Sequence, residues 1–269
     1  MRILAIFVTT VLFLTRPVCA EIHHDIYAAL HMDEVVAVMR QEGLDEAEAT
    51  AEIYLKNSVR NNFDDAVDAL YAEASIKGQL LNGLRAALSE SDAELALEFY
   101  RTPLGMLVGK LETTGRVAIS NDAVEEMAIS IAQKALQAKD ERAELLQSAA
   151  DEMGLTEYNL SGAFAARYAF LSGLPEADEL GISQDQIIEL IAADEDSLRA
   201  EIDQWVLGFV FMAYRPLSDT ELSDYLAFQM SSIGKALNQA LFESFNAVSI
   251  HNAGQLGKLL ATALQARDL

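Results

Sequence analysis

Cysteine is almost absent from this sequence, since Cys19 is the single one among 269 residues. It lies in an N-terminal segment that starts with a basic residue and continues with an apolar run over residues 3–14. A charged start, a short apolar stretch and small residues before a cleavage point are typical of a secretory signal peptide. We therefore predict a signal peptide over residues 1–20 and cleavage after Ala20. The mature chain would then have no cysteine for a disulfide, a thiol nucleophile or a metal site.

Basic residues are scarce relative to acidic ones. The chain has 19 Lys+Arg against 42 Asp+Glu and a formal net charge of −23, and removing the leader, which holds two arginines and no acid, lowers this charge to −25. Nucleic-acid binding depends on lysine and arginine that neutralise phosphates, and anionic lipid surfaces attract polybasic segments. The composition therefore argues against a nucleic-acid partner and an anionic membrane surface. It favours attraction of cations or basic proteins.

Proline and long apolar runs are also rare. The chain has four prolines, and the densest apolar stretch after the leader covers only Trp205 to Tyr214, whereas a membrane span needs roughly 20 apolar residues. We predict a buried helix there and no transmembrane segment. Apolar residues recur at three- and four-residue steps, without sustained two-residue alternation, which predicts helices and little or no sheet. The predicted fold class is all-α, a helical bundle.

The same periodicity predicts individual helices. An apolar face runs from Ile26 to Met39, and Gly43 is expected to end that helix. Asn121 or Asp122 is expected to begin a further helix, and Gly154 to end another. The remaining predicted helices, of which the last two are expected to be broken within, cover residues 45–60, 63–88, 156–172, 183–214 and 218–264.

The most informative pattern is an internal similarity at an offset of 129 residues. Residues 88–92 (Leu-Ser-Glu-Ser-Asp) match residues 217–221 (Leu-Ser-Asp-Thr-Glu), and the similarity continues without a gap to Gly105 and Gly234. Self-similarity at a fixed spacing is typical of repeated structural units. We therefore predict an internal duplication that gives two related helical halves. The predicted halves are residues 21–150 and 151–269.

Each repeated segment begins with a helix-start signal. Ser89 and Ser218 precede helical runs, and each has an acid three residues later. The serine hydroxyl can accept a hydrogen bond from a free backbone N–H, and Glu221 can complete a capping box at Ser218. Both helices then reach a glycine, which permits close approach of another backbone. In the first copy, Pro103 is expected to kink the helix just before this glycine.

Residues 95–105 (Leu-Ala-Leu-Glu-Phe-Tyr-Arg-Thr-Pro-Leu-Gly) resemble the hallmark helix of a bacterial exported family that is catalogued only as a domain of unknown function. The family pattern is an apolar-aromatic pair, a small polar residue, proline, any residue and glycine. The second copy, residues 228–234, departs from the pattern because Ser232 replaces the proline. The resemblance implies a helical envelope protein and carries no catalytic residues to this chain.

Histidine offers one specific metal hypothesis. After cleavage the chain would begin Glu21-Ile22-His23, with a free amine and a histidine in third place. The amine, two deprotonated backbone amides and the imidazole would supply four nitrogens in a plane, a geometry that Cu(II) and Ni(II) favour. The alternative is an unordered polar tail without a role. No other cofactor is expected, since the Walker and dinucleotide-binding motifs are absent.

Patterns for nucleophilic catalysis are missing. There is no Gly-x-Ser-x-Gly motif, and His251 is the only histidine far from the N-terminal segment that could act as a base. We therefore predict a non-catalytic envelope protein that binds a protein partner or a small apolar ligand. It is expected to be exported to the periplasm, or secreted if the host has no outer membrane. Two alternatives stay open: Cu(II) or Ni(II) binding at the mature N-terminus, and an enzyme that uses carboxylates not identifiable from the sequence. A carboxylate of raised pKa in a cleft would favour the enzyme.

Overall fold

The computed structural model describes residues 19–55, 57–174 and 183–267, and every regular element in these ranges is an α-helix. This confirms the predicted all-α helical bundle. The helices are α1 (Cys19–Ala29), α2 (Met32–Tyr54), α3 (Asn57–Leu70), α4 (Glu73–Ala87), α5 (Glu90–Tyr100), α6 (Pro103–Ile119), α7 (Asp122–Gln137), α8 (Glu141–Glu152), α9 (Leu155–Gly173), α11 (Gln184–Ala192), α12 (Glu195–Tyr214), α13 (Asp219–Met230) and α14 (Ser232–Arg267).

The predicted signal peptide lies almost wholly outside the described residues, and only Cys19 and Ala20 belong to the first turn of α1. Export and the cleavage point therefore stay predictions. Across the part of the chain that the structure does describe, no helix combines the length and the apolar character needed to cross a bilayer.

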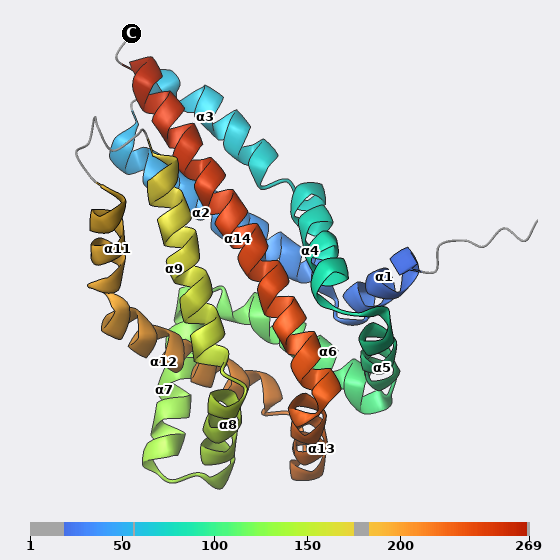
Figure 1. Ribbon diagram of the computed structural model, residues 1–269. Helices are drawn as coiled ribbons and strands as arrows, with labels where there is room; N and C mark the ends of the chain where they lie inside the picture. The colour runs from blue at the N-terminus through green and yellow to red at the C-terminus, as the bar shows by residue number, and fades with distance from the viewer. Residues whose placement is uncertain (1–18, 56, 175–182, 268–269) are drawn as a thin grey trace, which may run out of the picture.

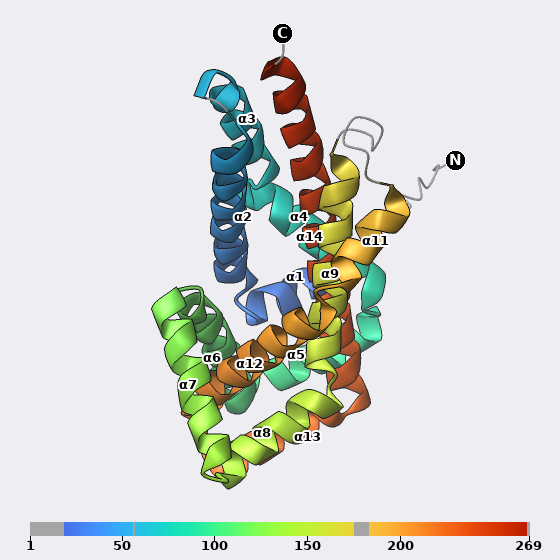
Figure 2. The same cartoon turned by 90° about the vertical axis from the view of Figure 1, so that its left-hand side faces the viewer.

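The long helix α14 runs diagonally through the molecule and contacts most of its neighbours (Figure 1). It packs against α9 on one side and against α3 and α4 on the other. Towards the other end, α12 packs against α6, α7 and α8 (Figure 2). One hydrophobic core joins these layers, and it includes Ile26 and Leu84 as well as Tyr225 and Leu260. The core is thus continuous between the two predicted halves, whose division stays a prediction.

Helices α9 and α14 touch backbone to backbone because glycines lie in their interface. A Cβ atom on Gly173 would lie 2.5 Å from the carbonyl oxygen of Gly254, and one on Gly257 would overlap the carbonyl oxygen of Phe170. Side chains at these positions would force the helices apart. The two helices therefore form one tightly joined pair.

Several predicted helix boundaries are wrong. The predicted helix over residues 45–60 is divided, since α2 ends at Tyr54, the chain is extended at Leu55 and α3 begins at Asn57. Gly43 does not end a helix, because α2 continues through it to Tyr54 and the ring of Tyr71 occupies the space that a Cβ would need. The chain instead turns at His31, which has a left-handed backbone with φ 51° and separates α1 from α2. The predicted helix over residues 63–88 is also divided, since the chain is extended at Ala72 between α3 and α4.

The predicted helix starts of the repeat are confirmed. The hydroxyl oxygen of Ser89 accepts a hydrogen bond from the backbone N–H of Asp92 at 3.1 Å. The hydroxyl oxygen of Ser218 accepts one from Glu221 at 3.3 Å, and the Glu221 carboxylate accepts one from the Ser218 backbone N–H at 2.8 Å. The full capping box therefore forms at the second copy. These bonds pair backbone donors that the helices themselves leave free.

Pro103 begins a helix and does not kink one, contrary to the prediction. Thr102 is the N-cap of α6, its hydroxyl oxygen accepts a hydrogen bond from Gly105 at 3.0 Å, and Pro103 occupies the first helical turn. Proline suits this position because its missing N–H would be unpaired there. Ser231 accepts the equivalent bond from Gly234 at 3.1 Å without a proline nearby. The hydroxyl cap is therefore the feature that the two helix breaks share.

Candidate ligand-binding cavity

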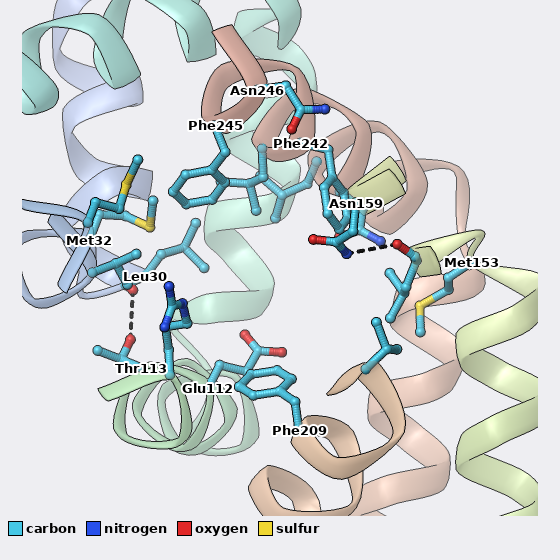
Figure 3. Close-up of a pocket in the computed structure, with 18 of the residues that line it drawn as sticks. Leu30, Met32, Glu112, Thr113, Met153, Asn159, Phe209, Phe242, Phe245 and Asn246 are labelled. Atoms are coloured by element: carbon cyan, nitrogen blue, oxygen red, sulfur yellow. Dashed lines mark hydrogen bonds between the residues drawn. The ribbon is translucent and has the colours of Figure 1, made fainter. Parts of the chain in front are cut away.

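A cavity of about 410 Å³ lies among α2, α6, α9, α12 and α14. Its walls are mostly aliphatic and aromatic, and Phe209, Phe242 and Phe245 are among the rings that line it (Figure 3). Trp205, the single tryptophan of the chain, also lines it. This volume falls in the range of about 300–1,000 Å³ that is usual for small-molecule pockets.

One carboxylate, Glu112, points into this cavity from α6 (Figure 3). It belongs to the inward-facing stripe of α6, together with the buried residues Val108, Thr113 and Ile119. Among 42 acidic residues, no motif marks Glu112 in the sequence. The signal that identifies it is its position four residues after Val108 on an apolar helix face, because residues at that spacing share a face.

Two tyrosine hydroxyls hold one oxygen of this carboxylate. The Tyr214 hydroxyl donates to Glu112 Oε1 at 2.7 Å, and the Tyr225 hydroxyl donates to the same atom. The side-chain amide of Gln229 in turn donates to the Tyr225 hydroxyl oxygen. Within residues 19–55, 57–174 and 183–267, no protein donor bonds Glu112 Oε2. The carboxylate is thus oriented through Oε1, and Oε2 is the acceptor left for a group in the cavity.

Burial shifts the pKa values of Glu112 and of the tyrosines around it. It raises the pKa of Glu112 above its ordinary value, and the hydrogen bonds from Tyr225 and Tyr214 partly oppose the rise. Burial also raises the pKa of Tyr100, Tyr214 and Tyr225 well above the usual value, and the nearby Glu112 charge adds to this effect. The tyrosines are therefore neutral hydrogen-bond donors at physiological pH, and Glu112 is the ionisable group of the cluster.

A second polar feature of the cavity wall is already paired. Arg116 donates from Nη2 to both carboxylate oxygens of Glu42, at 2.7 Å and 2.6 Å. Its guanidinium carbon also lies 6.0 Å from the centroid of the Trp205 ring. The charges of Arg116 and Glu42 therefore offset each other, while in the described part of the chain no basic side chain forms an ion pair with Glu112.

The offset of 129 residues relates opposite walls of the cavity. Positions on α6 that line it correspond to positions on α14 that also line it, and these pairs are Glu112 and Leu241, Thr113 and Phe242, and Arg116 and Phe245. The rings of Phe99 and Phe228, which are related by the same offset, stack with centroids 3.8 Å apart. At these equivalent positions α6 is polar and α14 is apolar, while α14 also contributes Asn238, Asn246 and Ser249 elsewhere in the lining.

Of the predicted metal-binding residues Glu21, Ile22 and His23, the last two do not line the cavity, and the side chain of Glu21 lies outside the described part of the chain. They belong to α1, where the His23 ring is 3 % exposed and its Nε2 lies 2.9 Å from the carbonyl oxygen of Leu88. A four-nitrogen chelate at a free chain end would require this ring to leave its contact. No group of three or more His, Cys, Asp or Glu in the described ranges is placed to hold a metal ion. The Cu(II) or Ni(II) site stays a prediction.

Comparisons with known proteins found no match: no family model, curated protein or solved structure is similar enough to this chain to be identified with it. The resemblance of residues 95–105 to a family of unknown function therefore stays a prediction. The function has to be argued from the cavity and its lining residues.

Proposed function

We propose that this protein binds a small, largely apolar molecule in the cavity, as a non-catalytic protein of the cell envelope. The observation that carries this proposal is a space of about 410 Å³ walled mainly by aliphatic and aromatic side chains. Each square ångström of apolar ligand surface removed from water contributes roughly 25 cal/mol to binding. The predicted leader and the acidic composition support a location in the periplasm.

We also propose that the cavity arose between two copies of a duplicated helix pair, α5–α6 and α13–α14. Three observations support this: the matching hydroxyl caps at Thr102 and Ser231, the stacked pair of Phe99 and Phe228, and the equivalent cavity positions on α6 and α14. The proposal explains why residues so far apart in sequence lie on facing walls of one cavity.

An enzyme is the second candidate, favoured by the raised pKa of Glu112 in a cavity. Within the described residues, however, the protein groups that hydrogen-bond Glu112 are two tyrosine hydroxyls whose pKa is itself strongly raised. Such hydroxyls do not exchange protons readily at neutral pH, so the cluster orients one carboxylate and holds no acid–base pair. This arrangement supports recognition better than turnover.

Trp205 provides the test, because a ligand in the cavity changes the surroundings of the single tryptophan. Titration of the protein with n-octanol should give a saturable change in tryptophan emission. Val35→Phe places extra bulk on the cavity wall and should weaken the affinity by about tenfold or more, equivalent to ~1.4 kcal/mol.

The matched control is Ile53→Phe, since Ile53 is 73 % exposed and does not line the cavity. It should bind n-octanol as the unmodified protein does. An unsaturable response, or equal affinity in a folded Val35→Phe variant, would contradict binding in this cavity. Recovery of a chemically altered ligand would favour the enzyme.

A further inference from the structure

Glu112 places a negative charge in the cavity wall. This charge restricts the chemical class of the ligand that the cavity can bind. We propose that the ligand is an amphiphilic cation, an organic ammonium ion on an apolar body, whose charged group binds Oε2 of Glu112. This inference deepens the proposed function and rests on it. It is carried by hydrogen bonding, by the charges of the cavity wall and by the aromatic rings.

The hydrogen bonds of Glu112 come first. Oε1 accepts from both Tyr214 and Tyr225, and in the described part of the chain Oε2 has no protein donor. An ionised carboxylate can only accept hydrogen bonds, so the group that completes Glu112 has to be a donor. A charged N–H donor forms a bond to a carboxylate roughly twice as strong as a neutral donor does. An ammonium group therefore fits the open position best.

The charged side chains of the cavity wall also favour a cationic ligand. Arg116 is bound to Glu42, so the carboxylate of Glu112 is left without a counter-charge in the cavity. Glu112 is half-buried, and a cation that reaches its carboxylate offsets part of the cost of removing that charge from water. A ligand carboxylate would meet repulsion instead. The net charge of −23 for the whole chain also draws cations towards the protein.

Aromatic rings surround the same region. Trp205 and Phe209 both line the cavity and stack with their centroids 5.4 Å apart, and the Tyr214 and Tyr225 rings lie 5.2 Å apart. Phe209 and Glu112 both point into the cavity (Figure 3). A cation within about 6 Å of a ring face is attracted to its negative quadrupole. A carboxylate among aromatic rings therefore favours an ammonium over a neutral group of the same size.

The ammonium competes with a proton for Glu112. Burial raises the pKa of this carboxyl, so acidification should weaken binding of a permanent cation. The titratable and charged groups that face Glu112 or share its cavity wall, from α2, α5, α6, α12 and α13, are Glu42, Tyr100, Arg116, Tyr214 and Tyr225. Burial raises the pKa of the tyrosines well above the usual value, so they stay neutral over this range, while the raised pKa of Glu112 links its charge to pH.

Three compounds with the same octyl chain test the inference: n-octylamine, n-octanol and octanoate, each titrated at neutral pH with Trp205 emission as the readout. We expect n-octylamine to bind at least about tenfold more tightly than n-octanol, and octanoate to bind most weakly. Glu112→Gln should abolish the preference for the amine, so that n-octylamine and n-octanol bind this variant with similar affinity. Glu126→Gln changes an exposed acid on α7 and should retain the preference.

A second measurement needs no variant. The affinity for n-octylamine, which stays protonated from acidic to neutral pH and keeps its N–H donors, should fall as the pH is lowered, whereas the affinity for n-octanol should stay constant. Equal affinity for n-octylamine and n-octanol, or tighter binding of octanoate, would overturn the inference and leave the cavity function standing. No binding of any of the three would contradict the proposed function as well.

Discussion

The helix pairs α5–α6 and α13–α14 begin alike and end differently. Each second helix is capped by a hydroxyl, from Thr102 or Ser231, and reaches a glycine packed under the end of the first helix. A Cβ on Gly105 would overlap the carbonyl oxygen of Phe99, and one on Gly234 would overlap the carbonyl oxygen of the equivalent Phe228. Caps and glycines thus give the two pairs the same local geometry.

The difference lies in the side chains that this geometry presents to the cavity. Glu112 and Arg116 on α6 are polar, whereas the equivalent Leu241 and Phe245 on α14 are apolar. Backbone geometry depends on a few residues at the helix starts, so the cavity-facing positions are free to differ. At these positions α6 therefore supplies charged side chains and α14 supplies apolar ones, while the backbone geometry of the two helix pairs stays the same.

The largest effect is expected from the two glycines. Gly105→Ala and Gly234→Ala should each lower the free energy of unfolding by about 1–3 kcal/mol, because the added methyl group meets backbone atoms that cannot rotate away. Urea denaturation measures both. Similar losses of stability in both variants would support the same local geometry in α5–α6 and α13–α14. A loss in only one variant would contradict it.

Gly78→Ala is the matched control, because nothing lies within 4 Å of the position of its Cβ on α4. This variant should raise the free energy of unfolding by about 0.5–1 kcal/mol, since glycine is costly inside a helix. A loss of stability at Gly78 would show that any alanine in these helices is harmful and would remove the support from the two packed glycines.

Removing the N-cap serines should lower the free energy of unfolding by different amounts in the two helix pairs. Ser218→Ala is expected to cost about 1–2 kcal/mol and Ser89→Ala about 0.5–1 kcal/mol, because only Ser218 belongs to a full capping box. Urea denaturation of both variants measures the difference. Ser223→Ala, an exposed change within α13, is the control and should stay within about 0.5 kcal/mol of the unmodified protein. A greater loss at Ser89 would contradict this ranking.

The smallest effect concerns Glu112 and appears as a slope with pH. Burial raises the pKa of Glu112 in the folded state, so the folded protein binds this proton more tightly than the unfolded chain does. The resulting stability is fully present below the unfolded pKa, near ~4.3, and is lost as pH rises through the folded pKa. Glu112→Gln should remove this slope.

Urea denaturation at several pH values compares the two proteins. The stability of the unmodified protein relative to Glu112→Gln should be greatest at acidic pH and should decline as pH rises. The tyrosines around Glu112 do not titrate in this range, because their pKa values are raised well above the ordinary value. A slope of the opposite sign would mean that the tyrosine hydrogen bonds outweigh burial.

Most helix boundaries were predictable from the sequence because their signals act within one turn. Asn121 caps α7, Ser183 caps α11 in a capping box, and Gly154 adopts the left-handed backbone between α8 and α9, with φ 66°. Such signals depend on residues that are three or four positions apart. They are visible without any knowledge of the fold.

Features that depend on distant residues were missed. Gly43 has the composition of a helix stop, but the ring of Tyr71 packs against it and α2 continues. The hydroxyls that hold Glu112 come from Tyr214 and Tyr225, 102 and 113 residues away along the chain. The local sequence of α6 does not predict these partners. It shows only that Glu112 is an acidic residue on an otherwise apolar helix face.

The contact between α9 and α14 and the methionine side chains of α2 differ in how easily they can change conformation. Gly173 and Gly254 bring the two backbones together, so no side chain separates the helices at that point. The facing wall on α2 contains Met32 and Met39, whose unbranched side chains change rotamer easily. The methionine side chains of the α2 wall are therefore the part of the lining that adapts most readily to the shape of a bound molecule.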